Sequence, residues 1–379
     1  MNTQTRNDNE SLTSALRQRL CGAVRAADGW LPFDRLMAMA LYEPGLGYYA
    51  NSSPKFGLMP EGTAGQGSDF VTAPELSPLF GATLARQVAQ ALDATGTDEV
   101  WEFGAGNGTL AVQLLNALGA QGLAPRRYNI VDLSGMLRAR QQTNLLRYAD
   151  RVRWVDQLPE NFEGVVVGNE VLDAMPVQLL CRQGGVWYER GVILSSDGSL
   201  AWAERQTQLR PPIPIEGQHD YLTEVHFQAE AFIRTLAERL RRGAAFFIDY
   251  GFPAAEYYHP QRHMGTLMCH RAHRSDDLPL LDVGLKDITA HVNFTGIALS
   301  AQDAGMTVMG YTSQGRFLIN CGLLDVARTA SVQSHAMLGR LVNEHEMGEL
   351  FKVIAMVPEA SATNWQPMGF ATGDRTHRL

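Results

Sequence analysis

The chain has 379 residues, of which 45% are hydrophobic and 19% are charged. This composition is typical of globular proteins and excludes a disordered or fibrous chain, and the length suffices for two average domains or one elaborated α/β domain. The formal net charge of −8 argues against broad contact with a phosphate backbone, which needs a dominant basic surface. We therefore expect no nucleic-acid partner.

The cysteines and the N-terminal residues indicate in which cellular compartment the protein is expected. The four cysteines are widely spaced and form no C-x-x-C pair, which favours a reducing compartment. Residues 1–10 lack the apolar core of a secretory signal and carry acidic residues that a transit peptide lacks. The sequence contains no run of eighteen apolar residues. We expect a cytoplasmic protein without a membrane span.

The first third of the chain is predicted to be helical. After a polar and flexible N-terminus of residues 1–10, apolar residues at helical spacing predict helices over 11–42, and a loop rich in Gly and Pro follows over 44–68. A helix over 73–92 opens with Pro74, which suits the first turn of a helix. Residues 11–95 thus form a predicted helical extension with a covering loop.

From residue 96 to residue 357 the pattern predicts the core of the protein. Short apolar runs alternate with helical patterns, which is typical of a parallel sheet with helices on both faces. The elements predicted first are strands at 99–103, 128–132, 152–155 and 164–168, and helices at 108–119 and 134–147. Hairpin signals at Gly184-Gly185 and Asp197-Gly198 then predict an antiparallel insertion over about 177–225.

The last third of the chain continues this alternation. Residues 251–285 are rich in Pro, Gly, His and Arg and are long for a simple connection, which predicts a lid or substrate loop. A polar tail is expected over 358–379. The other elements predicted here are helices at 225–242, 286–304, 314–328 and 332–346, and strands at 244–249, 307–311 and 352–357.

The most informative segment is a glycine-rich turn between the first predicted strand and its helix. Gly104, Gly106 and Gly108 allow a tight turn and a close approach to a ligand at the start of a helix. Thr109 stands where the dinucleotide fingerprint has glycine or alanine. Glu102, two residues before the first glycine, favours a cationic or hydroxyl-rich ligand. S-adenosylmethionine, a sulfonium with an α-amino group, fits, and a turn without any ligand is the alternative.

Acidic residues close the next two predicted strands. In a doubly wound sheet the ligand lies outside the carboxyl ends of the strands. Asp132 there can accept hydrogen bonds from both hydroxyls of a ribose, or it caps the following helix. Asp156 can meet an adenine amino group, or it is a turn aspartate. Asp249, at the end of the fifth strand, is open to either kind of role.

The segment from Asn169 to Pro176 gathers polar side chains after the fourth strand. If the chain turns helically, Glu170 and Asp173 share one face and present two carboxylates to one guest, whereas the alternative is capping with solvated acids. The segment lacks the Asn-Pro-Pro-aromatic motif of enzymes that methylate DNA bases. Glu75 lies in the first turn of the helix that follows 68–72, where stabilisation of the helix dipole is the alternative role.

A zinc site is suggested by Cys269, His270, His273 and His263. The sequence has no second ligand cluster with metal spacing, so we expect no metal.

Several of these segments together resemble the MidA-type family of S-adenosylmethionine-dependent methyltransferases, over about Phe33 to Val357. The segments that carry the resemblance are 68–75, 102–110, 169–176, 249–251 and 265–274. The resemblance implies a Rossmann-like, seven-stranded class I methyltransferase sheet. Departures are small: Ala105 replaces a common proline, Ala73 a common serine and Asp132 a common glutamate. The cofactor-binding residues predicted from motif and resemblance together are Glu102, Gly104, Ala105, Gly106, Gly108, Asp132, Leu133, Asp156 and Asn169.

The resemblance also bears on the acceptor. Mitochondrial members of the family are protein arginine methyltransferases linked to assembly of respiratory complex I, which implies a protein substrate, with a respiratory-complex subunit as one candidate. Glu170 and Asp173, with Glu75 as a third, are the predicted catalytic carboxylates, which would hold a guanidinium and accept its proton. The alternatives are a scaffold or assembly protein that binds the cofactor without turnover and, more distantly, an NAD-dependent oxidoreductase, which Thr109 disfavours. The sequence makes no prediction of oligomeric state.

Overall fold

The computed structural model describes residues 3–51, 71–132, 135–271, 274–328, 330–362 and 365–379. The chain divides into two compact units, and each is built from separate stretches of sequence. Unit 1 contains Met1–Phe70, Asp173–Glu230 and Phe252–Gly296, and unit 2 contains Val71–Leu172, Ala231–Gly251 and Ile297–Leu379. Most of the loop predicted over 44–68, together with Leu133 and His273, lies outside the described residues.

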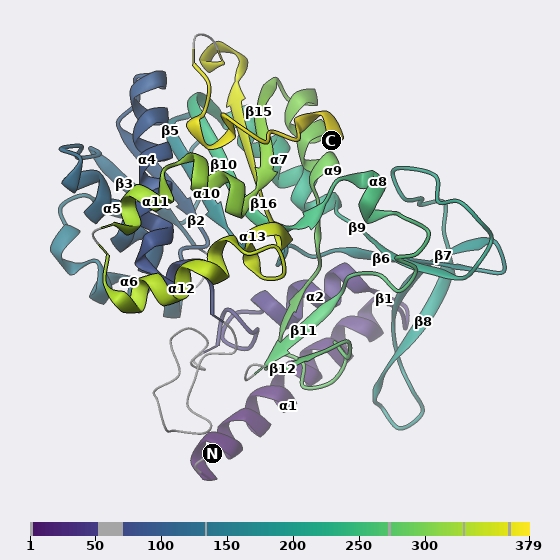
Figure 1. Cartoon of the computed structure of the whole chain (residues 1–379). Helices are drawn as coiled ribbons and strands as arrows, with labels where there is room; N and C mark the ends of the chain where they lie inside the picture. The colour runs from purple at the N-terminus through teal and green to yellow at the C-terminus, as the bar shows by residue number, and fades with distance from the viewer. Residues whose placement is uncertain (1–2, 52–70, 133–134, 272–273, 329, 363–364) are drawn as a thin grey trace. The chain divides into compact units, whose positions relative to one another are not determined.

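Unit 2 contains the predicted parallel sheet (Figure 1). Along the described chain seven strands pair in the order β15-β16-β10-β5-β2-β3-β4, and a two-residue strand, β14 (Val292–Asn293), pairs with β10 as an eighth. The predicted α/β fold is confirmed, with one short strand beyond the predicted seven. The neighbours from β10 to β4 are parallel, and β16 runs antiparallel to both β10 and β15. The strands are β2 (Glu99–Phe103), β3 (Arg127–Val131), β4 (Val152–Val155), β5 (Phe162–Asn169), β10 (Leu240–Phe252), β15 (Met306–Ser313) and β16 (Phe351–Pro358).

The central strands of this sheet are buried on both faces. Val165, Val166 and Val167 of β5 are each fully buried, as expected for a strand that helices cover on both sides. Helix α4 (Pro78–Thr95) and helix α5 (Thr109–Ala120) contribute to one packed cluster with alternate strand residues. On the other face, Phe232 of α7 (Phe227–Arg239) contacts Phe103 and Phe247 edge to face.

The order of the strands fixes where a ligand can bind. Strand β2 is flanked by β3 on one side and by β5 on the other, so the order of the chain reverses at β2. In open α/β sheets this switch point opens a crevice at the carboxyl ends of the strands. The glycine turn, Asp132, Asp156 and Asn169 follow or close β2, β3, β4 and β5 at that edge.

Unit 1 combines helices with an antiparallel sheet. Helix α1 (Thr3–Ala26) and helix α2 (Phe33–Tyr42) share a buried cluster with residues of β6 and β7. The two predicted hairpins are confirmed, because β6 pairs with β7 and β7 pairs with β8. Gly184 and Gly185 both have positive φ, as a two-residue turn between twisted strands requires. The strands are β1 (Leu31–Pro32), β6 (Gln178–Gln183), β7 (Val186–Leu194), β8 (Leu200–Gln206) and β9 (Tyr221–Val225).

A second, smaller sheet of unit 1 corrects one prediction. The helix predicted over 286–304 is wrong in its first part, because α9 (Phe294–Asp303) is preceded by β13 (Asp287–Thr289), a strand of this smaller sheet, and by β14, which pairs with β10. The β-branched residues Ile288, Thr289 and Val292 favour the extended chain, and β13 pairs with β11. The other elements in the segment predicted as a lid are α8 (Ala254–Tyr257), β11 (Met268–Arg271) and β12 (Arg274–Asp276).

Two further predicted helices are each divided. The helix predicted over 73–92 forms α3 (Ala73–Leu76) and α4, because Ser77 precedes Pro78 and is thereby driven to an extended conformation, with φ −155° and ψ 134°. The helix predicted over 314–328 forms α10 (Gln314–Asn320) and α11 (Leu323–Ala327), which Gly322 separates with a φ of 82°. The remaining α-helices of unit 2 are α6 (Gly135–Asn144), α12 (Val332–Val342) and α13 (Met347–Leu350).

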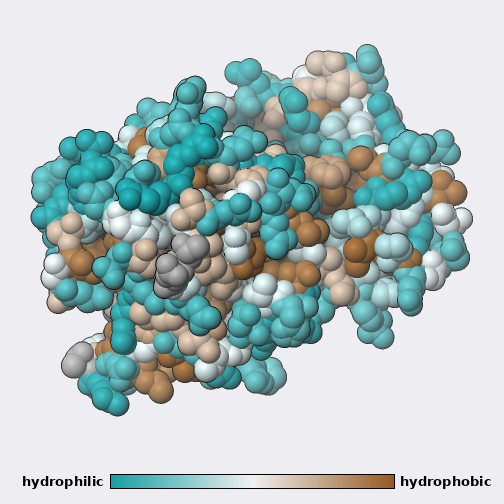
Figure 2. Space-filling view, turned by 90° about the horizontal axis from the view of Figure 1, so that it is seen from above, coloured by the Kyte–Doolittle hydropathy of each residue, from teal (hydrophilic) through white to brown (hydrophobic). Residues whose placement is uncertain are grey.

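The segment predicted as a polar tail, 358–379, packs on unit 2. Phe370 is buried and meets Phe317 with their ring centroids 5.4 Å apart, and Asp374 Oδ1 accepts a hydrogen bond from Tyr311 N at 2.9 Å. On the outside, Figure 2 shows hydrophobic side chains interspersed among hydrophilic ones on the face seen from above. Within the part of the chain that the structure describes, no helix combines the length and apolar character needed to cross a membrane.

Candidate active site

The glycine turn of unit 2 has a backbone that other residues could not adopt without strain. Gly104, Gly106 and Gly108 have φ values of 63°, 54° and 86°, in the left-handed region. A Cβ on Gly104 would lie 2.9 Å from Val171 Cγ2, closer than a normal carbon contact. Gly108 is the N-cap of α5 and directly precedes Thr109, so the first N–H groups of the helix follow directly on the turn. The turn is thus open to a ligand that approaches the backbone.

Asn107 connects this turn to Glu75. Its Oδ1 accepts a hydrogen bond from Thr109 N at 3.0 Å, and its Nδ2 donates to Glu75 Oε1 at 2.8 Å. Glu75 Oε2 also accepts a long hydrogen bond of 3.4 Å from Thr72 N, at the start of the short helix α3. Burial raises the pKa of Glu75 above its usual value, although these hydrogen bonds oppose the shift. The predicted third carboxylate therefore stands beside the glycine turn.

Gln141 is a further site residue that the sequence analysis missed. This fully buried side chain of α6 donates from Nε2 to the carbonyl of Gly106 at 2.9 Å and to Asp132 Oδ2 at 2.8 Å. Its Oε1 accepts a hydrogen bond from Trp154 Nε1 at 2.8 Å. One amide thus ties the glycine turn to the end of β3. The signal that could have found it is a polar residue on the apolar face formed by Leu137 and Leu145, four residues away on either side.

Glu102 is buried beneath the turn, with only 1% of its surface exposed. Its Oε2 accepts a hydrogen bond from the Tyr128 hydroxyl at 2.6 Å. Burial raises the pKa of Glu102 to about 8; the hydrogen bond from Tyr128 lowers it and the charge of Asp132 raises it further. A bound ammonium group would reverse this shift because it favours the charged carboxylate.

The two acids that follow β3 and β4 differ in exposure. Asp132 is half-buried and accepts the hydrogen bond from Gln141 described above. The side chain of Asp156 is 79% exposed and forms an ion pair with Arg138 of α6. The carboxylate of Asp132, which Gln141 holds in place, suits the paired hydroxyls of a ribose. The exposed carboxylate of Asp156 can exchange Arg138 for another partner.

The end of β5 holds a polar atom without a protein partner. Asn169 Nδ2 donates to Glu170 Oε1 at 3.0 Å, whereas Asn169 Oδ1 is buried and has no hydrogen-bond partner among the described residues. A buried acceptor left unpaired costs about 1–3 kcal/mol. A ligand donor at this edge of the sheet would satisfy it.

Glu170 adopts an uncommon backbone conformation with a φ of 54°. For a residue with a Cβ this costs on the order of 1–3 kcal/mol and requires support from its surroundings. The support comes from Asp249, whose Oδ2 accepts hydrogen bonds from Val171 N at 3.1 Å and from Leu172 N at 2.9 Å. Asp249 is 1% exposed, so its role is to position the turn at 170–172. The sequence left its role open.

Asp173 belongs to unit 1, since the boundary between the units falls after Leu172. The helical turn that would give Glu170 and Asp173 one shared face is absent, because the chain is irregular there and Glu170 is left-handed. Asp173 is 5% exposed, and its carbonyl accepts a hydrogen bond from Ala290 N at 3.0 Å.

For the segment that contains Cys269 and His270 the sequence analysis considered zinc but expected no metal. In the described chain, which omits His273, no three His, Cys, Asp or Glu residues are placed to hold an ion. Cys269 is buried on β11, and burial raises the pKa of its thiol. Burial lowers the pKa of His270.

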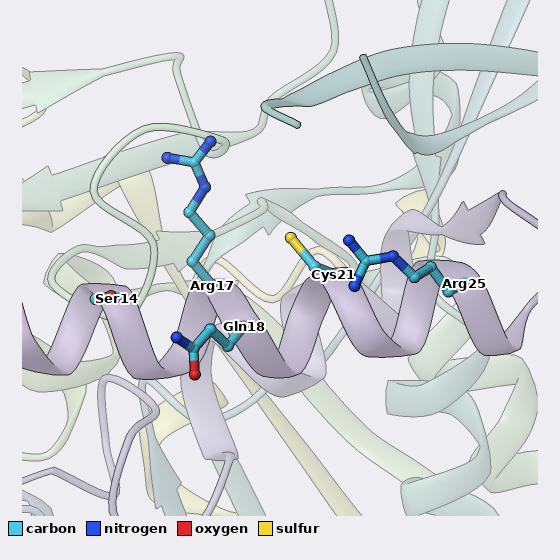
Figure 3. A pocket seen from close by; sticks show the side chains of 5 residues that line it. All are labelled: Ser14, Arg17, Gln18, Cys21 and Arg25. Carbon is cyan, nitrogen blue, oxygen red and sulfur yellow. The ribbon is translucent and has the colours of Figure 1, made fainter. Parts of the chain in front are cut away.

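A groove along α1 is lined by residues of that helix and by none of the predicted site residues. Figure 3 shows Cys21 between Arg17 and Arg25 on one face of this helix, with Ser14 and Gln18 nearby. Arg17 Nη2 donates to the carbonyl of Gly198, in the turn between β7 and β8, at 3.2 Å. This face therefore helps to pack unit 1.

The residues of unit 2 fit S-adenosylmethionine. The glycine turn provides space where a Cβ would otherwise project, Glu102 provides a buried acid for a cation, and Asn169 Oδ1 provides an unsatisfied acceptor. These features would hold the methionine part and its α-amino group, and Asp132 at the end of β3 is placed to accept hydrogen bonds from a ribose.

Comparisons with known proteins agree with this chemistry. Residues 83–312 match the model of a family described as S-adenosyl-L-methionine-dependent methyltransferase. A crystal structure of a protein from Burkholderia thailandensis bound to S-adenosyl-homocysteine is 50% identical, with a TM-score of 0.92 over 98% of each chain.

Curated relatives are more distant. The mitochondrial protein arginine methyltransferase NDUFAF7 homolog of Caenorhabditis elegans is 25% identical, covering 92% of this chain and 87% of its own. The human mitochondrial protein arginine methyltransferase NDUFAF7 is 26% identical, covering 85% and 79%. The fold, the glycine turn and these matches together show that the chain belongs to the MidA-type family of S-adenosylmethionine-dependent methyltransferases.

Proposed function

We propose that this methyltransferase modifies a nitrogen of a protein arginine side chain. The observation that carries the proposal is Glu170, a carboxylate at the carboxyl end of β5 in a strained conformation that buried Asp249 supports. Strain that the surrounding structure maintains in this way clusters at functional sites. The printed names of the curated relatives, which are protein arginine methyltransferases, support the choice of acceptor.

The acceptor chemistry explains why carboxylates are needed. A guanidinium is fully protonated at neutral pH, and its delocalised charge makes its nitrogens poor nucleophiles. When bound, S-adenosylmethionine supplies an electrophilic methyl group on a sulfonium that leaves as a neutral thioether. Glu170 and Asp173, with Glu75 as a third candidate, would hold the guanidinium fork, draw its charge away from the attacking nitrogen and accept the released proton.

We assign the cofactor to residues of unit 2. In this proposal Glu102 receives the α-amino group, Asp132 the ribose hydroxyls and Asp156 the adenine amino group. The backbone of residues 104–108 and Asn169 line the methionine side. Leu133, which the sequence analysis also assigns to the cofactor, lies outside the described residues.

The partner and the compartment are part of the same proposal. A protein substrate, with a respiratory-complex subunit as one candidate, follows from the family resemblance. A cytoplasmic location is supported by the free state of Cys21, Cys181, Cys269 and Cys321, since reducing compartments keep thiols unpaired.

Turnover can be tested with a labelled methyl donor. Wild type and Glu170→Ala would each be incubated with methyl-labelled S-adenosylmethionine and a lysate of the source organism, with Glu160→Ala, an exposed acid of unit 2, as the matched control. We expect a labelled protein band with wild type and with Glu160→Ala, and loss of the label with Glu170→Ala. Equal labelling by Glu170→Ala would remove Glu170 from the mechanism. Cofactor binding without any labelled band would favour a scaffold that lacks turnover.

A further inference from the structure

Unit 1 contains a group of residues that we call the acid–tyrosine cluster: Tyr42, Tyr49, Asp173, Asp287 and Thr289. The Tyr49 hydroxyl donates to Asp287 Oδ1 at 2.9 Å, and the rings of Tyr42 and Tyr49 stack with their centroids 5.6 Å apart. Tyr42 donates from its hydroxyl to the carbonyl of Ala174, the residue after Asp173. The members come from α2, from the turn after it, from the chain at 173 and from β13.

Both acids of the cluster are buried and close to one tyrosine. Asp173 is 5% exposed and Asp287 is 3% exposed. Burial raises the pKa of Tyr49 well above its usual value, and the charges of Asp287, of the Tyr42 phenol and of Asp173 add to the effect in that order. Two carboxyl groups near the same phenol concentrate negative charge in a region shielded from water, where electrostatic interactions are stronger. A ligand with positive charge and several N–H donors suits such a place.

Thr289 provides independent evidence for a polar ligand. This side chain is 3% exposed, and its Oγ1 is buried with no hydrogen-bond partner in the described chain. It lies two residues after Asp287 on β13, so the two side chains project to the same side of the strand. The next residue, Ala290, donates from its backbone to the carbonyl of Asp173. The unsatisfied hydroxyl therefore belongs to the same region as both acids.

The lysine next to the cluster forms an ion pair with a different acid. Lys286 directly precedes Asp287, and its Nζ donates to Asp276 at 2.7 Å and 2.9 Å. The ammonium is therefore committed to Asp276.

We propose that the acid–tyrosine cluster is the recognition site for the guanidinium of the acceptor arginine, in which Asp287 and Thr289 contact the guanidinium and Tyr49 positions Asp287. The inference rests on the proposed function and adds to it the side chains that select the acceptor. A guanidinium is planar, stacks on aromatic rings and presents five N–H donors in a fixed fork. Asp173 and Asp287 accept from the fork, and Thr289 Oγ1 accepts a further N–H.

The cluster predicts a choice between basic side chains. A lysine ammonium offers three donors from a single nitrogen, whereas an arginine offers five donors from three nitrogens in a fixed plane, which can engage acceptors on separate residues. Citrulline has the shape of arginine without its charge. We therefore expect the order arginine, then lysine, then citrulline in affinity for this site.

The test measures binding in the absence of turnover. Full-length protein saturated with S-adenosyl-homocysteine would be titrated calorimetrically with short peptides that differ only in a central arginine, lysine or citrulline. The variants are Asp287→Asn, Thr289→Val and Tyr49→Phe, which change one or two atoms each. Asp277→Asn is the matched control, because Asp277 is exposed and follows β12, which shares the small sheet with β13.

We expect Asp287→Asn to weaken the arginine peptide about tenfold to a hundredfold, and Thr289→Val and Tyr49→Phe to weaken it less. Asp277→Asn should bind like wild type, and the affinity for S-adenosyl-homocysteine should not change in any variant. If Asp287→Asn fails to fold, the two milder variants carry the test.

Two results would overturn the inference. One is equal affinity of wild type for the arginine and citrulline peptides, and the other is arginine affinity that Asp287→Asn, Thr289→Val and Tyr49→Phe all leave unchanged. Either result is separable from the proposed function, because labelled arginine in the lysate experiment would still establish arginine methylation. Conversely, the protein could bind the arginine peptide more tightly than the citrulline peptide while no arginine is labelled in the lysate. That pair of results would support the recognition site and contradict arginine methylation.

Discussion

The glycine turn of unit 2 and the acid–tyrosine cluster of unit 1 present different kinds of site. The turn exposes backbone groups, with Gly104, Gly106 and Gly108 in left-handed conformations within five consecutive residues. The cluster presents side chains of Tyr49, Asp173 and Asp287, which come from three separate parts of the chain. A site made of backbone is therefore local in sequence, whereas a site made of side chains depends on the fold.

The largest effect is expected at Gly104, where a side chain would disturb the backbone of the glycine turn. We expect Gly104→Val to weaken S-adenosylmethionine binding more than about a hundredfold, because the valine would combine a φ of 63° with a Cβ 2.9 Å from Val171 Cγ2. Gly119→Ala is the control, since a Cβ at this position of α5 meets nothing within 4 Å. Calorimetry measures the affinities, and thermal melting shows whether each variant folds. Near-normal binding by Gly104→Val would remove the turn from the cofactor site.

The next largest effect concerns the pH dependence of unfolding through Glu102. The carboxyl ionises near 4.5 when unfolded and near 8 in the folded chain, so only the folded state holds this proton between those values. The contribution of Glu102 to the free energy of unfolding is therefore present below about 4.5 and falls, by up to about 1.4 kcal/mol per pH unit, as the pH rises to about 8. Urea unfolding from pH 5 to pH 8 should show a flatter profile for Glu102→Gln than for wild type. Identical slopes would contradict the raised pKa.

Cofactor binding gives a second measure of the same group. A ligand ammonium beside Glu102 favours the carboxylate, so binding near pH 7 should release a proton that Glu102→Gln cannot release. Calorimetry in buffers with different ionisation enthalpies measures that proton. A release that is the same in both proteins would assign the α-amino group to another acid.

A smaller effect is expected at Asp249. Asp249→Ala leaves Val171 N and Leu172 N without their acceptor, which costs about 1–3 kcal/mol in the free energy of unfolding. Glu163→Ala, which removes an exposed ion pair with Arg242, should cost less than about 1 kcal/mol. Chemical denaturation compares the two variants. Equal costs would mean that Asp249 does not hold the turn at 170–172.

The smallest effect is expected at Asp156. Its side chain is exposed and paired with Arg138, so Asp156→Ala should weaken S-adenosylmethionine binding only about threefold to tenfold. Arg138→Ala, which removes the ion pair and leaves the acid, should weaken binding less. Calorimetric affinities that do not differ between Asp156→Ala and wild type would make Asp156 a turn residue.

The sequence predicted what depends on local pattern. The boundaries of β2, 99–103, and β4, 152–155, agree with the prediction, because short apolar runs between turn signals define buried strands. The glycine turn was recognisable because its three glycines are needed where they stand. The two hairpins of unit 1 were predicted for the same reason, since Gly184-Gly185 determines a turn by itself.

The sequence could not predict what depends on distant contacts. The left-handed Glu170 is supported by Asp249, which lies 79 residues later, and no local signal connects the two. The pairing of β13 with β11 overrode the helical pattern predicted over 286–304. Asp287 and Thr289 drew no attention for the same reason, because their neighbours in the cluster are more than a hundred residues away.

The central claim is the proposed methylation of a protein arginine, and mass spectrometry of the labelled product tests it most directly. The labelled protein band from the lysate would be digested and the methyl group located within its peptide. We predict that the methyl group lies on a guanidino nitrogen, and that Asp287→Asn reduces this product while its affinity for S-adenosylmethionine stays normal. A methyl group on lysine, on a carboxylate or on a small molecule would contradict the account.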